Sequence, residues 1–84
     1  IITLEINGVE YSSEALASYL KSNTEKNIVF IIGDENGIPD FIKAKSNFSI
    51  SLSKMTFTHE FARLIFLEQL YRAFTINAGM KYHK

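Results

Sequence analysis

The sequence predicts an α/β domain built on a mainly parallel sheet, and two features lead to this expectation. Apolar runs alternate with helical patterns along the 84 residues, in the order strand, helix, strand, helix, strand, helix. The middle run, residues 28–32, contains five apolar residues in succession, which is typical of a strand covered on both faces, as in parallel sheets. A chain of this length should form one domain over residues 1–84.

The first elements are a strand and a short helix. Residues 1–6 are mostly apolar and β-branched and should be extended, and the Asn-Gly pair at 7–8 signals a turn before a second extended stretch. Ser12 or Ser13 can cap the next helix, because a serine hydroxyl accepts a hydrogen bond from a free amide of the first turn. We expect this helix to end near Ser22.

The middle of the chain should form two more strands joined by a short helix. The strand at 27–32 ends in a glycine-containing loop, 33–37, at the carboxyl end of the strand, where open α/β sheets usually bind ligands. Pro39 suits the first position of a helix that we expect to end near Ala44. Residues 47–52 form the third predicted strand, with alternate apolar side chains on one face.

The last element is a long helix from about Glu60 to Ala78, capped by Thr56 or Thr58 and ended by Gly79. Its apolar residues point in nearly every direction, whereas a surface helix of a monomer has one apolar stripe. A chain of this size has little material to cover such a helix on two sides. We therefore expect the second side to meet another copy of the chain, in a homodimer.

Composition limits the classes of protein to consider. No stretch approaches the roughly 20 apolar residues of a membrane span, and the absence of cysteine excludes disulfides and thiolate metal sites. We expect a soluble, cytoplasmic protein. The net charge is zero, but residues 1–42 carry −5 and residues 43–84 carry +5. This polarity favours an anionic partner for the C-terminal half, although ordinary solvated surface charge would give the same pattern.

Few motifs point to chemistry. The loop at 33–37 lacks the spacing of a phosphate-binding loop, so its glycines are either turn residues or a place where a ligand approaches the backbone at Gly33. The two histidines, His59 and His83, are far apart, and we expect no metal site. No serine lies in a nucleophile-elbow motif. Glu68 and Arg72 should form an ordinary ion pair within one helix.

The C-terminal residues Tyr82, His83 and Lys84 combine an aromatic ring, an imidazole and a cation. Such a group can stack on a nucleobase and contact a phosphate, but a disordered tail is the alternative.

Five segments together resemble one family. They are Phe30-Ile31-Ile32-Gly33, Ser51-Leu52-Ser53-Lys54-Met55-Thr56-Phe57-Thr58-His59, Arg63, Leu67-Glu68-Gln69-Leu70-Tyr71-Arg72-Ala73-Phe74-Thr75 and Tyr82-His83-Lys84. In this order and spacing they resemble the ribosomal large subunit methyltransferase H family, of the SPOUT class. Its members methylate N3 of a pseudouridine in 23S rRNA with S-adenosylmethionine. They are nearly twice as long, and the chain resembles only their C-terminal part, without the first strands and helices of the usual domain.

The resemblance implies an α/β domain with a deep trefoil knot at its C-terminal end, assembled as a homodimer that acts on 23S rRNA in the assembled ribosome. The cofactor contacts that it implies lie on three loops at strand ends, at Leu4, Gly33, Leu52, Ser53, Lys54, Met55, Thr56 and Phe57. It places Tyr82, His83 and Lys84 in the substrate site, completed by Arg63 or Arg72 of the partner subunit. The chain departs from the family at Asp34, where a glycine is usual, and at Thr58, where a proline is usual. Asp34 could narrow the loop or contact the ribose.

Methyl transfer from a sulfonium depends mainly on alignment of the reacting atoms, but N3 must also lose its proton. His83 is the first candidate to assist this step and His59 the second, because imidazole titrates near neutral pH. Two other interpretations stay open from the sequence. One is a truncated, non-catalytic module for dimerisation or S-adenosylmethionine binding, and the other is an unrelated small α/β interaction domain.

Overall fold

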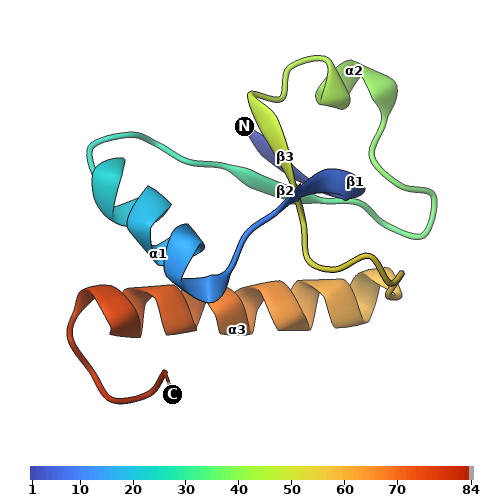
Figure 1. The fold of residues 1–84 in the computed structure, drawn as a ribbon. Coiled ribbons are helices and arrows are strands. Elements are labelled where there is room, and N and C mark those ends of the chain that lie inside the picture. The colour runs from blue at the N-terminus through green and yellow to red at the C-terminus, as the bar shows by residue number, and fades with distance from the viewer. Residues whose placement is uncertain (84) are drawn as a thin grey trace.

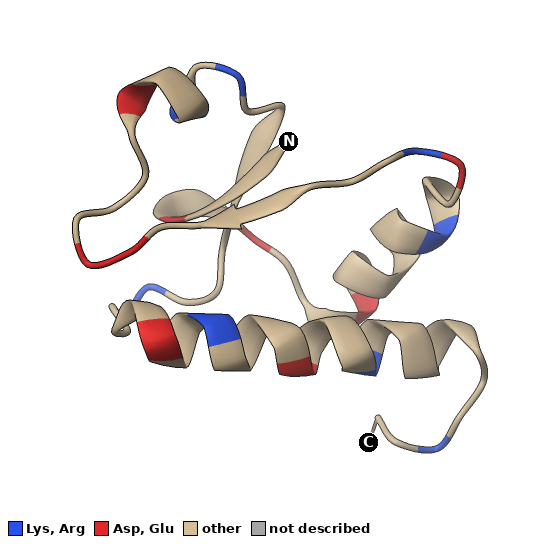
Figure 2. Ribbon diagram, turned by 180° about the vertical axis from the view of Figure 1, so that it is seen from behind, with Lys and Arg blue, Asp and Glu red and all other residues tan. Residues whose placement is uncertain are grey.

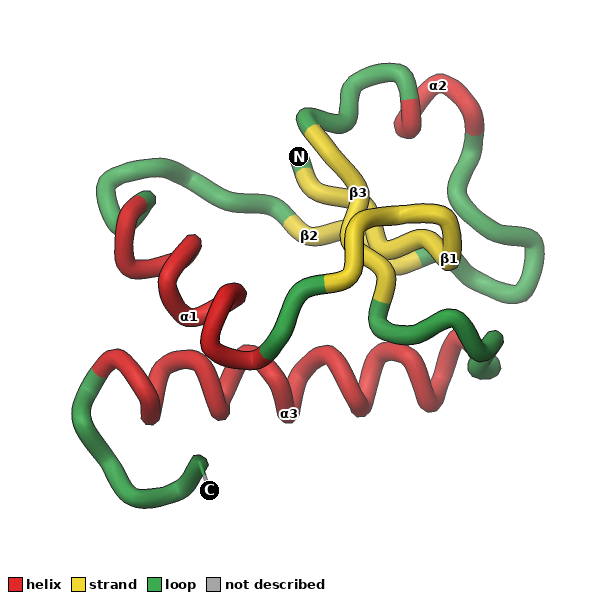
Figure 3. Tube along the Cα trace, viewed as in Figure 1, coloured by secondary structure: helices red, strands yellow, loops and turns green. Residues whose placement is uncertain are grey.

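Three parallel strands form the sheet of this protein in a computed structural model, which describes residues 1–83. The strand order is β2 (Phe30–Ile32), β1 (Ile2–Glu10), β3 (Phe48–Ser51), so that β1 lies in the centre. Helices α1 (Ser13–Ser22) and α3 (His59–Asn77) lie together on one side of the sheet, and the single turn α2 (Asp40–Lys43) lies on the other (Figures 1 and 3). The α/β class and the parallel sheet are confirmed.

Residues 7–8, where a turn was expected, fall within β1, and the chain loops out and returns there. Leu4 and Val9 both pair with Ile50 of β3, so the register shifts between them and the intervening residues bulge out. A Cβ atom on Gly8 would lie 2.7 Å from the backbone carbon of Ser49. The glycine is therefore needed for close contact between two backbones.

The expected burial of the second strand on both faces is also wrong. β2 has three residues, lies at the edge of the sheet, and none of its side chains is fully buried. Phe30 packs against Phe66 of α3 with ring centroids 4.8 Å apart, whereas Val29 just before the strand is 52% exposed. The apolar run predicted a strand correctly. The central strand, however, is the one that pairs on both edges, and this is β1, which pairs with β2 and with β3.

The helix caps agree closely with the sequence-based prediction. The Ser12 hydroxyl accepts a hydrogen bond from the Ala15 amide at the start of α1, and Thr58 accepts one from Phe61 at the start of α3. Pro39 is the N-cap residue of α2 and not its first helical residue, so the helix begins one residue later than expected, at Asp40.

The C-terminal end of α3 is closed by a Schellman motif. Gly79 adopts a φ of 73° and donates to the Ile76 carbonyl, and Met80 donates to the Thr75 carbonyl at 2.9 Å. The chain reverses at this glycine, so the C-terminal residues return along α3 (Figure 1).

The hydrophobic core lies between the sheet, α1 and α3, and consists of Ile2, Leu16, Ala17, Ile50, Phe66 and Ala73 with partly buried neighbours. The opposite face of α3 exposes five large apolar side chains, here called the apolar stripe: Phe61, Leu64, Leu67, Tyr71 and Phe74. The helix is thus apolar on a buried and on an exposed face, as the sequence indicated. Within residues 1–83, no helix has the length and apolar character needed to cross a membrane.

Candidate functional site

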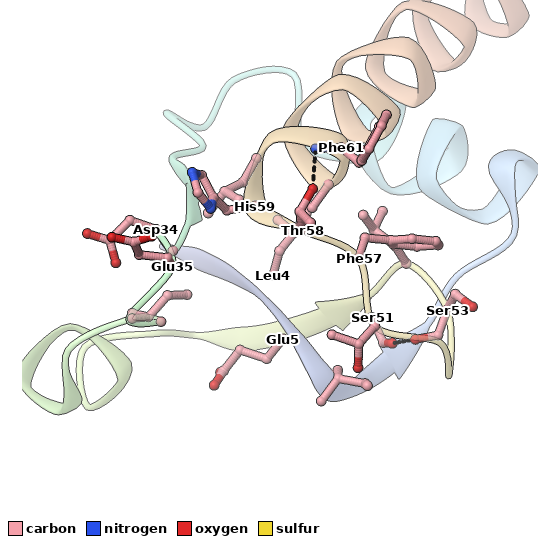
Figure 4. A pocket seen from close by; sticks show the side chains of 18 of the residues that line it. Leu4, Glu5, Asp34, Glu35, Ser51, Ser53, Phe57, Thr58, His59 and Phe61 are labelled. Atoms are coloured by element: carbon pink, nitrogen blue, oxygen red, sulfur yellow. Dashed lines mark hydrogen bonds between the residues drawn. The ribbon is translucent and has the colours of Figure 1, made fainter.

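A cavity of about 750 Å³ opens where the loops after β2 and β3 meet the bulge of β1 and the first turn of α3. The close-up view shows labelled lining side chains from all of these elements (Figure 4). Seven of the eight positions expected to contact a cofactor line this cavity: Leu4, Gly33, Leu52, Ser53, Met55, Thr56 and Phe57. The eighth, Lys54, is exposed and is not part of the lining. Folding thus gathers three loops that are distant in the chain.

The loop after β2 is shaped by its glycines and by Asp34. A Cβ atom on Gly33 would lie 2.7 Å from the backbone carbon of Gly37 and 2.9 Å from the Ile38 nitrogen, so only glycine allows the loop to fold this tightly. The Asp34 carboxylate accepts from the Asn36 amide, and its carbonyl accepts from the Gly37 amide, both at 2.9 Å. Asp34 therefore closes a turn at the rim of the cavity.

The loop after β3 is also held by side-chain hydrogen bonds. The buried Ser51 hydroxyl donates to the Ser53 carbonyl at 2.8 Å, and the Ser53 hydroxyl accepts from the Met55 amide at 3.0 Å. Met55 is left 74% exposed on this loop, and Phe57 and Ile6 are also exposed beside the cavity. An open cavity with apolar walls and a few polar groups is typical of a small-molecule site.

Glu5 is a charged lining residue that the sequence analysis did not single out. Its carboxylate accepts from the hydroxyls of Ser49 at 2.8 Å and Thr3 at 3.0 Å, and lies 3.1 Å from the Lys43 ammonium. The hydrogen bond from Ser49, assisted by Lys43 and Thr3, lowers the pKa of Glu5 even though partial burial opposes this. The available signal was an acidic residue between the apolar residues Leu4 and Ile6.

The rim of the cavity is acidic. Asp34, Glu35 and Glu60 line it, and Figure 4 shows the first two on the side where His59 lies. The His59 imidazole is 3.5 Å from the Glu60 carboxylate. Within residues 1–83, no group of three His, Cys, Asp or Glu side chains is arranged to hold a metal ion.

The C-terminal residues form a second polar cluster on α3, here called the tail network: Glu68, Tyr71, Arg72, Tyr82 and His83. The Tyr82 hydroxyl donates to Glu68 at 3.0 Å, and its ring packs edge-on against Tyr71 with centroids 4.9 Å apart. The Arg72 guanidinium carbon lies 4.9 Å from the Tyr82 ring centroid. Tyr82 and His83 are thus held in place, contrary to the alternative of a disordered tail.

Glu68 is the centre of the tail network. Its carboxylate pairs with Arg72 at 2.9 Å and also accepts from the Tyr82 hydroxyl and from the side-chain amide of Gln69. The Arg72 hydrogen bond lowers the pKa of Glu68, and the hydrogen bond to Glu68 raises the pKa of Tyr82. The expected ordinary ion pair is therefore part of a larger arrangement that joins the helix to the tail.

Within one chain, the structure does not bring the tail to the cavity. Arg72, Tyr82 and His83 lie together, but His59 lines the cavity at the other end of α3, about 20 Å away along the helix axis from Arg72. Arg63 is exposed on α3 between the two sites. Lys84 lies outside the described residues. The predicted substrate residues therefore form two separate groups in the single chain.

Comparisons with known proteins agree with the resemblance seen in the sequence. A family model described as "Predicted SPOUT methyltransferase" matches residues 1–83. The chain is 46% identical over 86 residues to the ribosomal RNA large subunit methyltransferase H of Caldicellulosiruptor saccharolyticus, a match that covers all of the chain and 56% of the relative. It is 49% identical over 84 residues to the protein of the same name from Prochlorococcus marinus strain MIT 9515, with 61% of the relative covered. The chain thus spans little more than half the length of these curated relatives.

Proposed function

Since the chain belongs to the SPOUT methyltransferase family, we propose that it transfers the methyl group of S-adenosylmethionine to N3 of a pseudouridine in 23S rRNA. The names of the two relatives support an rRNA of the large subunit as the substrate. The observation that carries the proposal is the gathering of seven expected cofactor positions around one cavity of about 750 Å³. An rRNA substrate would place the protein in the cytoplasm.

The residues around the cavity fit this cofactor. Ile6, Met55 and Phe57 offer apolar surface for the adenosyl group, and the polar backbone of the two loops borders the same space. The acidic rim suits a ligand that carries a positive sulfonium and an ammonium group. Bound S-adenosylmethionine would supply an electrophilic methyl group, and the chain's task is then to hold it in line with N3.

The apolar stripe supports a homodimer as the functional form. Its residues are spaced symmetrically about the middle of α3, so a two-fold axis there would place two copies of the helix antiparallel. Phe61 would then meet Phe74 of the partner subunit, and Leu64 would meet Tyr71 of the partner subunit. These contacts would cover side chains that the single chain leaves more than half exposed. The trefoil knot implied by the resemblance stays a prediction.

The same antiparallel arrangement would complete the active site. The tail network lies near the C-terminal half of α3, and the cavity opens at its N-terminal turn. Reversal of the partner helix would bring the tail of one subunit to the cavity of the other. We therefore place Tyr82 and His83 at the substrate side of the partner's cavity, where the exposed Arg63 is available for a phosphate contact. Lys84 and Arg72 belong to the substrate site only by the family resemblance.

Lysine and arginine positions are spread over α1, α2, α3 and several loops and do not gather on one element (Figure 2). Binding to free RNA should therefore be weak, which favours the assembled ribosome as the substrate, where many surfaces contribute. His83 and then His59 are the candidates to assist removal of the N3 proton.

Two measurements on the 84-residue chain test the proposal. Calorimetry should detect binding of S-adenosylmethionine, and 70S ribosomes that lack the modification should gain a methyl group at N3 of a pseudouridine. His83→Ala should abolish turnover and leave cofactor affinity unchanged. Binding without methylation would identify a non-catalytic module, and absence of both would refute the cofactor site.

A further inference from the structure

The tail network determines which nitrogen of His83 carries a proton. The Arg72 guanidinium has only donors and stays charged at all accessible pH values. One of its terminal nitrogens lies 3.0 Å from Nδ1 of His83. Nδ1 must therefore be the acceptor of this hydrogen bond, and a neutral ring then carries its proton on Nε2.

The surroundings of Nε2 agree with this assignment. Nε2 lies 3.4 Å from a carboxylate oxygen of Glu14 in α1, which can accept a hydrogen bond from an N–H but cannot donate one. The other charged or titratable groups of the cluster are Glu68, which pairs with Arg72, and the two tyrosines Tyr71 and Tyr82. The His83 side chain is 27% exposed, so its orientation is set mainly by these contacts.

Glu68 in turn sets the position of Arg72. It contacts both Nε and a terminal nitrogen of the guanidinium, at 3.1 and 2.9 Å, which fixes the plane of the group. The remaining terminal nitrogen is the one that reaches His83. The same carboxylate holds the Tyr82 hydroxyl. One residue on α3 thus organises two residues of the tail.

We propose that Glu68 is a positioning residue which, through Arg72, holds His83 as the neutral Nε2–H tautomer, so that on substrate binding the Nε2–H group leaves Glu14 and donates a hydrogen bond to the substrate instead of accepting the N3 proton. In this arrangement the only lone pair of the neutral ring faces Arg72. The carbonyl oxygens beside N3 are the acceptors that an Nε2–H group would recognise. This inference rests on the proposed function, within which it refines the role of His83.

Nitrogen-15 NMR of histidine-labelled protein near neutral pH tests the tautomer without any activity. His83 should show one protonated and one unprotonated ring nitrogen, with the proton on Nε2. Glu68→Gln and Arg72→Gln should convert this pattern to a mixture of tautomers. Glu25→Gln, a carboxylate-to-amide change in the exposed loop before β2, should leave it unchanged. A wild-type Nδ1–H tautomer, or a Glu68→Gln spectrum identical to wild type, would overturn the proposal.

Substitutions at His83 separate a donor from a base. The amide nitrogen of glutamine can occupy the place of Nε2–H, and it donates but does not accept protons. His83→Gln should retain at least a tenth of the wild-type kcat, whereas His83→Ala should lose at least a hundredfold. An equal loss of kcat in His83→Gln and His83→Ala would show that the ring acts as a base and would refute the donor role.

Glu68→Gln should lower kcat at least tenfold with an unchanged Kd for S-adenosylmethionine, and an unchanged kcat would contradict a positioning role. Proton NMR dispersion should confirm that each variant is folded. If the wild type methylates no ribosomes, the proposed function fails. The NMR measurement still decides whether Glu68 and Arg72 hold His83 as the Nε2–H tautomer.

Discussion

The Lys43 ammonium lies 3.1 Å from the Glu5 carboxylate and connects α2 to the central strand β1 beside the cavity. Both residues line the cavity, and Glu5 also accepts hydrogen bonds from two hydroxyls. The contact therefore links α2 to the sheet.

The first prediction concerns this carboxylate. Because the pKa of Glu5 is lower in the folded chain than in the unfolded chain, its ionised form stabilises the fold above the usual glutamate pKa of about 4.3, and this stabilisation is lost as pH falls through the folded value. Glu5→Gln should reduce the free energy of unfolding by about 1 kcal/mol at pH 7, measured by urea titration. The difference between the two proteins should shrink below about pH 4. If the free energies of unfolding of wild type and Glu5→Gln differ by the same amount at all pH values, the ionised Glu5 carboxylate is not the source of the stabilisation.

The second prediction concerns the bulge of β1. Gly8→Ala should destabilise the protein by about 1–3 kcal/mol, because the new methyl group would meet the backbone of Ser49 at 2.7 Å. Gly79→Asn is the matched control: that position has open space, and asparagine tolerates a positive φ. Gly79→Asn should lower the free energy of unfolding by less than about 1 kcal/mol. If chemical denaturation shows the same loss of unfolding free energy for Gly8→Ala and Gly79→Asn, the bulge tolerates a side chain.

The third prediction separates the shape of the cavity from the stability of the fold. Gly33→Ala forces the loop after β2 to move, since the Cβ atom would lie 2.7 Å from Gly37. We expect the Kd for S-adenosylmethionine to rise at least tenfold in calorimetry. A Cβ atom on Gly37, in the same loop, would have free space. Gly37→Asn should therefore change the Kd for S-adenosylmethionine less than threefold. Unchanged affinity in Gly33→Ala would place the cofactor elsewhere.

The fourth prediction tests the dimer. Phe74→Ser removes the end of the apolar stripe that would meet Phe61 of the partner subunit, and sedimentation should show a shift toward monomer. Phe41→Ser, at an equally exposed phenylalanine on α2, is the control and should leave the association unchanged. A wild-type chain that sediments as a monomer at micromolar concentration would refute the homodimer.

The fifth prediction tests whether the site is shared between subunits. At S-adenosylmethionine concentrations well below the raised Kd of Gly33→Ala, the His83→Ala and Gly33→Ala proteins should each be nearly inactive, but after mixing and exchange of subunits the heterodimers contain one intact site. Methylation of ribosomes should then recover to roughly a quarter of the wild-type rate. No recovery, despite proven exchange, would mean that the tail and the cavity act within one chain.

Much of the local structure could be predicted from the sequence because it depends on neighbouring residues. Ser12 and Thr58 cap their helices through hydrogen bonds to amides three residues ahead, and Gly79 ends α3 because it adopts a left-handed conformation. The cofactor positions came from the family resemblance, and folding brings seven of them together around one cavity. What they bind is still a proposal.

Other features depend on contacts between distant parts of the chain, and only the tertiary structure decided them. β2 lies at the edge because β1 pairs on both sides, although the apolar run of β2 looked more central. Glu5 became part of the cavity through Ser49 and Lys43, and Glu68 became the centre of the tail network through Tyr82. By itself the sequence determined the helix ends, the strand-forming segments and the two apolar faces of α3, since each follows from residues within a few positions. Strand order, the β1 bulge and the separation of tail from cavity arise from long-range packing, which no local pattern encodes.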